Sequence, residues 1–221
     1  MHRTTPRRLA LGLLLTGAGT AVAAPAGVQA ATVTVNLPCQ VATFGLTAQL
    51  SGFTPNSTIS VTGDGIFESA TADATGSAQV QFTAPNLGSI DPKSKQYNLV
   101  ASDDAPTPIR ASGKFRSTNF AFGTTGGTKS PKATRSWRFS GLTPGKTIYG
   151  HFRFGGRTRA NYRFGVAKAP CGELTVLAPG IPVTGRVNTG KWNVQVDQKK
   201  VYSRTTKPRL TGSTTVFTTF G

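Results

Sequence analysis

The stretch SGFTPNSTI at residues 51–59 recurs as SGLTPGKTI at residues 140–148, with Ser, Gly, Thr, Pro, Thr and Ile matching across an offset of 89 residues. Each copy is a cluster of turn-forming residues between runs of alternating apolar and polar residues. An offset of about a hundred residues is the length of one small β-sandwich, whereas solenoid repeats span only about 20–50 residues. The repeat therefore predicts two β-sandwich modules in tandem.

The rest of the chain supports the same class. Short runs with period-two alternation lie between Gly, Pro, Asn and Asp residues, and beyond the N-terminal region no stretch keeps apolar residues at helical spacing. The predicted fold is all-β, with two tandem Ig-like β-sandwiches. For the first module we predict strands at 32–35, 42–50, 58–62, 77–83, 97–101 and 109–116. The side chains predicted to face inward there are Phe44, Leu46, Ile59, Val61, Val80, Phe82, Tyr97 and Leu99.

In the second module, strands are expected around Trp137 and Phe139, at the hairpin 148–164, and at 214–217. Two further runs alternate, namely Leu174 with Val176, and Trp192 with Val194 and Val196. Trp192 is expected in the core. Phe120 and Phe122 already alternate as a strand does, so the predicted modules are 31–117 and 118–221, with the Gly-rich piece after residue 122 as a loop of the second.

Residues 1–30 have the pattern of a secretory signal peptide, because Arg3, Arg7 and Arg8 precede an apolar run from Leu9 to Leu15 and then small residues. Cleavage is expected after Ala30, with Ala23 as the alternative site. The apolar run is too short and too rich in Gly and Ala to span a bilayer, which takes about 20 apolar residues. No later stretch is long enough either, so we expect a secreted, extracellular protein or one held non-covalently at the cell envelope.

The charge is distributed unevenly. Residues 31–221 hold 22 Lys and Arg against 8 Asp and Glu, a net charge of +14. Residues 31–105 hold two Lys against six acids, a net of −4, whereas residues 106–221 hold 20 basic residues against two acids, a net of +18. The first module is therefore expected to be mildly acidic and the second strongly basic. Such asymmetry bears on partners rather than on fold.

The hairpin of the second module has a register that can be argued from burial. A two-residue turn at Gly155-Gly156 would pair Phe154 with Arg157 and place charge in the core, so the pattern predicts a three-residue loop, 155–157. The predicted inward pairs are Phe154 with Thr158, Phe152 with Ala160 and Ile148 with Phe164, and the predicted outward pairs are Arg153 with Arg159, His151 with Asn161 and Tyr149 with Arg163.

Two interpretations of this outward face remain open. Directly opposed arginines destabilise a strand pair unless water or a counter-anion screens them, and a solvated charge-rich face is one reading. The other is a polyanion-binding face on which the Tyr149 ring stacks against the ligand. The basic tail region either contributes to this face or serves only solubility. Anionic cell-wall polymers, anionic lipid headgroups and extracellular nucleic acid are the candidate partners. The candidate residues are Tyr149, Arg153, Arg157, Arg159 and Arg163, and the tail holds Lys199, Lys200, Arg204, Lys207 and Arg209.

Cys39 and Cys171 are the only cysteines. An even number in an exported protein suggests a disulfide, and with one cysteine in each module an intramolecular bond would join module to module. Two free thiols and intermolecular pairing are the open alternatives. Subtracting the repeat offset places Cys171 opposite Phe82, far from Cys39, so the pair is not the intersheet bridge of an antibody domain.

Catalysis and cofactors are not expected. His151 is the one histidine after residue 30, and it is predicted on the outward face among arginines with no evident carboxylate to orient it. The chain has no Cys-x-x-Cys motif and no paired histidines, and the acids Asp64, Glu68 and Asp73 match no ordered calcium-ligand pattern. We therefore predict a non-catalytic protein with neither metal nor cofactor. A purely structural spacer and a hydrolase with an unrecognised site are the alternatives.

The second module contains several distinctive motifs: Leu142-Thr-Pro-Gly145, the strand Tyr149 to Phe154, Gly155-Gly-Arg157, Pro170-Cys171-Gly172 and Gly190-Lys-Trp192-Asn-Val-Gln195-Val-Asp197. With these motifs it resembles, over roughly residues 118–205, a set of uncharacterised secreted proteins of actinobacteria and their relatives, and the first module resembles a bacterial Ig-like repeat. This resemblance implies a secreted β-sandwich protein and brings no established activity.

Overall fold

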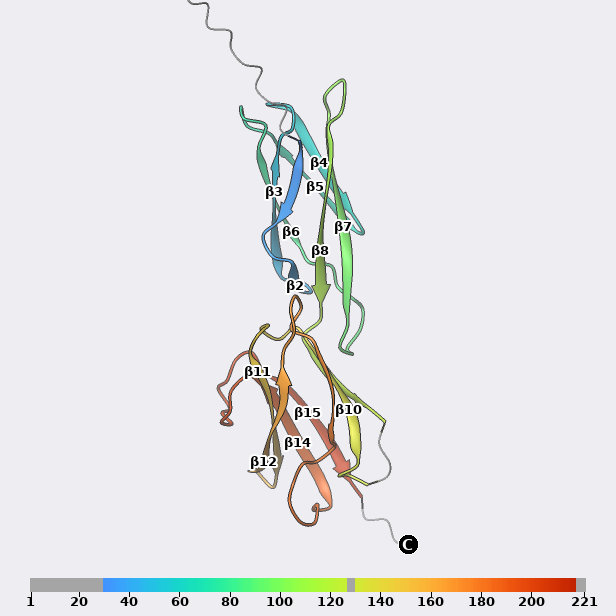
Figure 1. Ribbon diagram of the computed structural model, residues 1–221, viewed down its shortest axis with the longest axis vertical. Helices are drawn as coiled ribbons and strands as arrows, with labels where there is room; N and C mark the ends of the chain where they lie inside the picture. Colours follow the sequence, from blue (N-terminus) through green and yellow to red (C-terminus); the bar gives the residue numbers. More distant parts are fainter. Residues whose placement is uncertain (1–29, 127–129, 218–221) are drawn as a thin grey trace, which may run out of the picture.

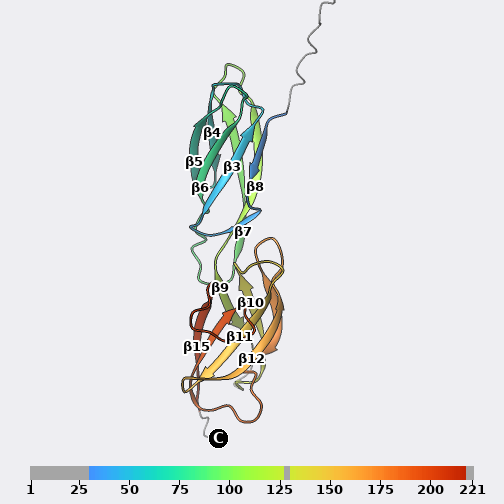
Figure 2. The same cartoon turned by 90° about the vertical axis from the view of Figure 1, so that its left-hand side faces the viewer.

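The computed structural model describes residues 30–126 and 130–217, and these residues form two β-sandwiches placed end to end (Figures 1 and 2). Within these ranges the chain contains fifteen strands and no helix. The all-β, tandem-sandwich prediction is confirmed. The signal-peptide prediction falls on residues 1–29, outside the described residues.

The first sandwich packs a three-stranded sheet against a five-stranded one. The smaller sheet has the order β1 (Thr32–Val35), β3 (Gly45–Ser51), β6 (Ala78–Thr83). The larger sheet has the order β2 (Cys39–Val41), β8 (Arg110–Thr118), β7 (Ser94–Asp103), β4 (Thr58–Gly63), β5 (Ile66–Thr71). Neighbouring strands are antiparallel except for β2 and β8, which are parallel. The core lies between the sheets.

The second sandwich repeats this plan. Its smaller sheet has the order β13 (Leu174–Pro179), β10 (Thr134–Ser140), β9 (Ala121–Thr125). Its larger sheet has the order β12 (Arg157–Val166), β11 (Thr147–Phe154), β14 (Gly190–Asp197), β15 (Leu210–Val216). Strand for strand, β9 matches β1, β10 to β13 match β3 to β6, and β14 and β15 match β7 and β8. Among the described strands, only β2 has no counterpart.

The repeated turn adopts the same backbone in both copies. Gly52 and Gly141 have φ angles of 77° and 75°, and the second turn position, Asn56 or Gly145, has φ angles of 61° and 78°. These left-handed conformations favour Gly and Asn. Both turns also bury the apolar residue that follows the first glycine, Phe53 or Leu142. The sequence repeat is therefore a repeat of structure.

A second pair of glycines shows where the offset changes. A Cβ on Gly76 would lie 2.1 Å from the carbonyl oxygen of Phe53, and one on Gly172 would lie 1.6 Å from that of Leu142. These glycines are equivalent, yet they are 96 residues apart rather than 89 because the β11–β12 hairpin is longer than β4–β5. Cys171 therefore corresponds to Thr75, and its predicted place opposite Phe82 is wrong.

Most predicted strands of the first sandwich are present, but β2 and β5 were not predicted, since neither has a clear alternating pattern. Seven of the eight predicted inward residues are buried. The prediction that Phe44 faces inward is wrong, because Phe44 is 61% exposed. Thr43 has φ of 70°, which ends the extended conformation before β3 begins at Gly45. The alternation that buries Leu46 therefore does not extend back to Phe44.

The expected acidity of the first module is also corrected. Strand β8 belongs to the first sandwich and carries Arg110, Lys114 and Arg116. Residues 31–118 therefore hold five Lys and Arg against six Asp and Glu, a net of −1, and residues 119–221 hold 17 against two, a net of +15. The first sandwich is nearly neutral, and the positive charge belongs to the second.

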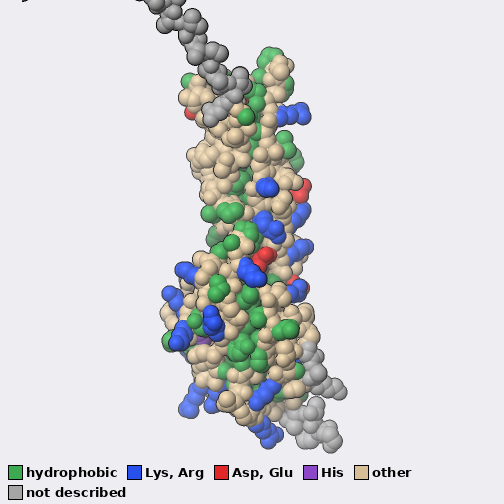
Figure 3. Space-filling model, in the orientation of Figure 1, with side chains coloured by type: hydrophobic (Ala, Val, Ile, Leu, Met, Phe, Trp, Pro, Cys, Tyr) green, Lys and Arg blue, Asp and Glu red, His purple; other side chains and the backbone are tan. Residues whose placement is uncertain are grey.

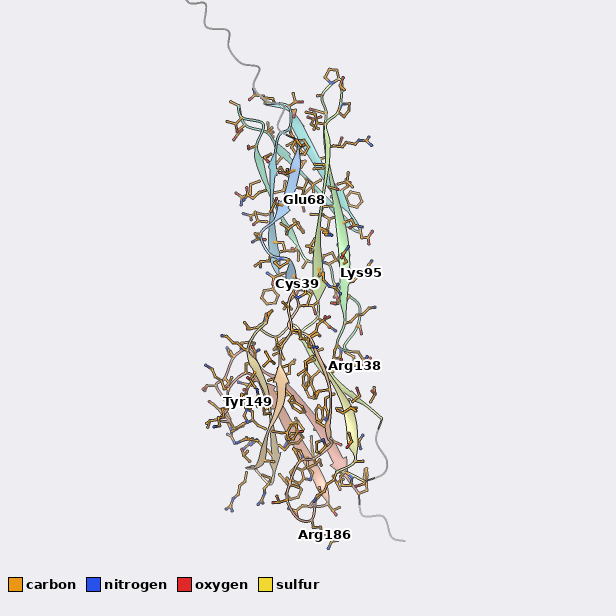
Figure 4. All side chains as sticks on the ribbon, in the orientation of Figure 1. Cys39, Glu68, Lys95, Arg138, Tyr149 and Arg186 are labelled. Atoms are coloured by element: carbon orange, nitrogen blue, oxygen red, sulfur yellow. A yellow bond between two sulfur atoms is a disulfide. The ribbon has the colours of Figure 1, made fainter. Side chains whose placement is uncertain are left out.

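Cys39 and Cys171 form a disulfide, with their Cα atoms 5.3 Å apart and a sequence separation of 132 residues. Cys39 begins β2 at the lower end of the first sandwich, and Cys171 lies in the loop of the second that reaches up to it (Figures 1 and 4). Polar contacts accompany this bond: Ser94 donates a hydrogen bond to Glu173, and Ser140 donates one to the carbonyl of Asn119. The two sandwiches are thus joined covalently and through hydrogen bonds.

Each repeated turn is held by a side chain at the end of the following central strand. Asp103 accepts hydrogen bonds from the backbone N–H groups of Thr54 (3.0 Å) and Ile109 (2.8 Å), and Gln198 accepts one from the N–H of Thr143 (3.1 Å). Burial disfavours the charged form of Asp103, but the backbone donors outweigh burial and lower its pKa. The first turn is therefore held by a charged group and the second by a neutral amide.

Acidification is expected to weaken the first turn through Asp103. A carboxyl group whose pKa is lower in the folded state adds stability above its unfolded pKa, and this stability is lost as the pH falls through the folded value. The loss should begin near pH 4, the ordinary aspartate range. Urea unfolding at pH 5 and pH 3 should show a smaller pH effect in Asp103→Asn than in the native chain. An identical drop in both proteins would contradict this role.

Candidate polyanion-binding face

The β11–β12 hairpin agrees with the predicted register in its middle and departs from it at both ends. Tyr149 pairs with Arg163, His151 with Asn161, and Phe152 with Ala160, as predicted. At the tip, however, Phe154 pairs with Arg157 and Arg153 with Thr158. The connection is therefore the two-residue turn Gly155-Gly156, with φ angles of 57° and 77°, which suits a type I′ turn.

A β-bulge explains why this turn does not bury charge. The register shifts between Phe152 and Arg153, so Arg159 is an extra residue that faces no single partner. The bulge restores the inward position of Ala160, and Arg157 lies exposed at the end of the sandwich. The predicted opposition of Arg153 and Arg159 is wrong, because Arg153 pairs with Thr158.

A second bulge lies at the other end of the hairpin. Ile148 pairs with Gly165 rather than with Phe164, which is buried with its ring centroid 4.8 Å from those of Trp137 and Phe139. A Cβ on Gly150 would lie only 2.6 Å from the Phe164 ring, so this bulge depends on a glycine across the strand pair. The hairpin is anchored in the core at this end, while Arg157 and Arg159 lie near its other end.

The predicted binding residues differ in availability. Arg157, Arg159 and Arg163 are exposed, and Tyr149 is half-buried beside Arg163. Arg153 is half-buried as well: its guanidinium lies 4.4 Å from the centre of the Tyr202 ring and donates a hydrogen bond to the carbonyl of Gly156. Arg153 therefore holds the local structure, and the three exposed arginines remain available to a ligand.

His151 is not on an open surface. It is completely buried, with Nε2 3.3 Å from Oδ1 of Asp197 and Nδ1 2.7 Å from Oδ1 of Asn161. His151 lies on the outer face of its sheet, as predicted, but it is covered there and has a carboxylate partner, so the expectation that no carboxylate orients it is wrong. Asp197 is itself completely buried and accepts hydrogen bonds from Gln195 and from the backbone N–H of Lys199. Both nitrogens of the His151 ring have hydrogen-bond partners, and neither His151 nor Asp197 is exposed to solvent.

The segment 198–209 helps to cover His151, and no pattern in the sequence predicts that this segment lies on the sheet. After β14 this segment crosses the outer face of the larger sheet, where Tyr202 packs edge-on against His151 at 5.8 Å between ring centroids. The carbonyl of Ser203 accepts a hydrogen bond from the Gln195 side chain. The one available signal was Val201-Tyr202, an apolar pair within a basic run.

This segment adds cations to the hairpin face. Lys199, Lys200 and Arg204 are exposed on it. Of the two acids of the second sandwich, Asp197 is buried and Glu173 is bonded to Ser94 of the first sandwich. Across the described residues, no Lys or Arg of the second sandwich forms a salt bridge. Figure 3 shows the resulting gathering of Lys and Arg along one side of this sandwich, and Figure 4 shows Tyr149 on the same side.

We define the basic face as Arg157, Arg159, Arg163, Lys199, Lys200 and Arg204. Strand β11 pairs with Arg157 and Arg163, Arg159 lies in the bulge between them, and the Tyr202 and Asp197 contacts fix the segment that carries the other three residues. Guanidinium groups present forked donors that match phosphate and carboxylate oxygens. The face can therefore bind a polyanion without first having to release an internal ion pair.

The described residues contain no group of three or more His, Cys, Asp and Glu side chains placed to hold a metal ion. Asp64 is instead paired with Lys95 at 2.9 Å. None of the described segments is a helix with the length and hydropathy needed to cross a bilayer.

No protein-family model matches the chain. No curated protein matches it either. Among solved structures, red sea bream transglutaminase matches with a TM-score of 0.32 and 12% identity, over 87% of this chain and 32% of that one. A Ca²⁺-stabilised adhesin of an Antarctic bacterium matches with a TM-score of 0.29 and 16% identity, over 85% of this chain and 48% of that one. A tetra-tandem repeat from the extending region of a large adhesion protein matches with a TM-score of 0.26 and 16% identity, over 84% and 48%.

This chain thus spans between a third and a half of these structures. TM-scores and identities this low carry no inference about its ligand or activity.

Proposed function

We propose that the protein is a secreted, non-catalytic interaction protein that binds anionic polymers through the basic face of its second sandwich. The observation that carries this proposal is a set of exposed arginines and lysines that form no salt bridge within the described residues. Unneutralised cations on a fixed scaffold attract polyanions and release the counter-ions of the polymer. The expected partner is an anionic cell-wall polymer or another extracellular polyanion.

Two further features support an extracellular, non-catalytic role. Disulfides form and persist in oxidising compartments, and the Cys39–Cys171 bond joins two separate sandwiches. His151 and Asp197 resemble the acid–base half of a catalytic triad, but neither has exposed surface and both imidazole nitrogens already have partners. A substrate has no route to this pair, so we assign it a structural role.

The binding proposal is tested by retention on a heparin column across a salt gradient. Reversing the charge of Arg157, Arg159 and Arg163 to Glu is expected to move elution from high salt to the start of the gradient. Counter-ion release predicts a linear fall of log K with log salt, with a slope of about 0.9 per phosphate contact on a duplex. A teichoic-acid column then asks whether a cell-wall polymer is held in the same way.

A matched control separates the basic face from net charge. Lys132, Lys168 and Arg186 are exposed elsewhere on the second sandwich, and Figure 4 places Arg186 at its far end. Changing these three residues to Glu alters the net charge equally and is expected to leave most of the retention intact. Equal losses in both variants would show that only the total charge matters. Early elution of the native protein would leave a structural spacer as its role.

A further inference from the structure

The duplicated topology allows the two sandwiches to be compared position by position along their open edge. In the first sandwich, β1 closes this edge against β8: a Cβ on Gly113 would lie 2.7 Å from the carbonyl oxygen of Val33 and 2.8 Å from its side chain. Val33 is 8% exposed. The smaller and larger sheets therefore meet here with backbone against backbone, and the core of the first sandwich is covered.

The equivalent positions in the second sandwich are Phe122 and Gly212, as the pairing registers show. Val33 pairs with Leu50 as Phe122 pairs with Phe139, and Gly113 pairs with Leu99 as Gly212 pairs with Val194. A Cβ on Gly212 would meet the tip of the Phe122 ring, at 2.8 Å, instead of backbone. An aromatic ring thus stands where the first sandwich has direct strand contact, and it holds β9 and β15 apart.

A second residue difference between the two sandwiches enlarges the gap between β9 and β15. Phe115 of β8 fills the core of the first sandwich, where it is 2% exposed and stacks on Tyr97 at 5.5 Å. Its equivalent in β15 is Thr214, because Tyr97 pairs with Phe115 as Trp192 pairs with Thr214. Thr214 points to the same side of its strand as Gly212 but is exposed. The volume of a phenylalanine ring is therefore missing from the second sandwich.

The space left is a groove of about 360 Å³ at the edge between the two sheets, where Figure 2 shows β15 beside β9. This volume falls within the range of small-molecule sites, about 300–1,000 Å³. The walls include Phe122, Trp137, Ile181, Val194 and Phe217, and Phe217 is 78% exposed. An apolar groove whose lining includes the exposed Phe217 and the half-buried Phe122 favours an apolar ligand body.

One charged side chain lines the groove. Arg135 is half-buried, lies against Gly180, and donates one hydrogen bond to the carbonyl of Gly126. A Cβ on Gly180 would lie 2.7 Å from Arg135 Nε, so the glycine leaves room for the guanidinium. The remaining guanidinium N–H groups can bind a carboxylate. Thr124 and Thr214, which pair with the buried Trp137 and Trp192 and so face inward, add polar groups to the lining.

We propose that this groove is a second binding site, which holds the apolar chain of a free fatty-acid-like carboxylate with its head group on Arg135. The site is separate from the basic face, since none of the basic-face residues lines it. It is specific to the second sandwich because the first fills the same position with Val33 and Phe115. If dodecanoate does not bind in this groove, the proposal that the basic face binds polyanions is unaffected.

Dodecanoate, used below its micelle concentration, is the probe, and isothermal titration calorimetry of the full oxidised chain is the measurement. Thr214→Phe restores the residue that the first sandwich has at this position, and we expect it to weaken dodecanoate binding at least about tenfold while the fold is kept. Thr211→Phe is the matched control, because Thr211 lies on the same strand but does not line the groove. We expect this control to bind dodecanoate as the native chain does.

Arg135→Gln tests the head group. Loss of a charge-assisted hydrogen bond should weaken the affinity for dodecanoate on the order of tenfold. Neutral dodecanol should bind the native chain and Arg135→Gln with the same affinity. Heparin retention should not change in Thr214→Phe. The proposal is overturned if dodecanoate does not bind, if it binds equally to the native chain and Thr214→Phe, or if only vesicles of anionic phospholipid bind.

Discussion

Replacing His151 by alanine is expected to lower the free energy of unfolding by about 3 kcal/mol, because it leaves a cavity and a buried Asp197 carboxyl group without its ring partner. Both residues are completely buried, and the pair fixes β11 to β14. The bonds that Asp197 keeps, from Gln195 and from the N–H of Lys199, limit the loss. Chemical denaturation monitored by circular dichroism measures the change.

The double variant His151→Ala, Asp197→Ala completes a double-mutant cycle. If the two side chains stabilise each other, the double variant should lose less than the sum of the two single losses. Tyr202→Phe serves as a control, since it keeps the ring that packs on His151 and removes only a hydroxyl. Additive losses would show that the pair is not coupled. The same variants should also alter the basic face, because Lys199 and Lys200 follow directly after Asp197.

Gly172→Ala is expected to cost at least about 3 kcal/mol of stability, through a steric clash combined with backbone strain. The added methyl group would lie 1.6 Å from the carbonyl oxygen of Leu142, and Gly172 has φ of 67°. Neither the repeated turn nor the loop that carries Cys171 can move away freely, because the N–H of Gly141 donates to the carbonyl of Cys171. Thermal unfolding of the oxidised protein measures the effect.

The first sandwich supplies an internal replicate of this substitution. Gly76→Ala should destabilise in the same way, since its methyl group would lie 2.1 Å from the carbonyl oxygen of Phe53. Gly145→Ala separates strain from clash, because Gly145 has φ of 78° but no heavy atom within 4 Å of its added Cβ. We expect it to cost only about 1 kcal/mol. A loss at Gly172 no larger than the one at Gly145 would refute the steric argument.

The fold was predictable because its main signals are local. The duplicated turn at 51–59 and 140–148 and the alternation around it specify two sandwiches, and each copy shows the same left-handed positions. The middle of the β11–β12 hairpin was predictable because burial selects which residues face each other. The turn was not, since a bulge at Arg159 changes side-chain parity within one residue and the sequence carries no mark of it.

The candidate site was harder to predict for a related reason. Exposure of the arginines followed from the alternation of β12, but the environment of Arg153 and His151 depends on Tyr202, 49 residues beyond Arg153. Contacts of this range leave no periodic pattern in the sequence. The groove beside β15 was likewise hidden, because it arises from two substitutions between copies that only the strand registers align.

The Cys39–Cys171 bond determines how the protein responds when it is pulled by its two ends. Tension would run from the segment before Cys39 through the sulfur atoms to the segment after Cys171, and strands β3 to β12 would lie outside this path. At about 3.4 Å per extended residue, the 132-residue loop withholds roughly 450 Å of chain from extension. Stretching can peel away β1 and the strands that follow Cys171, but while the bond stays oxidised the chain between the two cysteines cannot be drawn out.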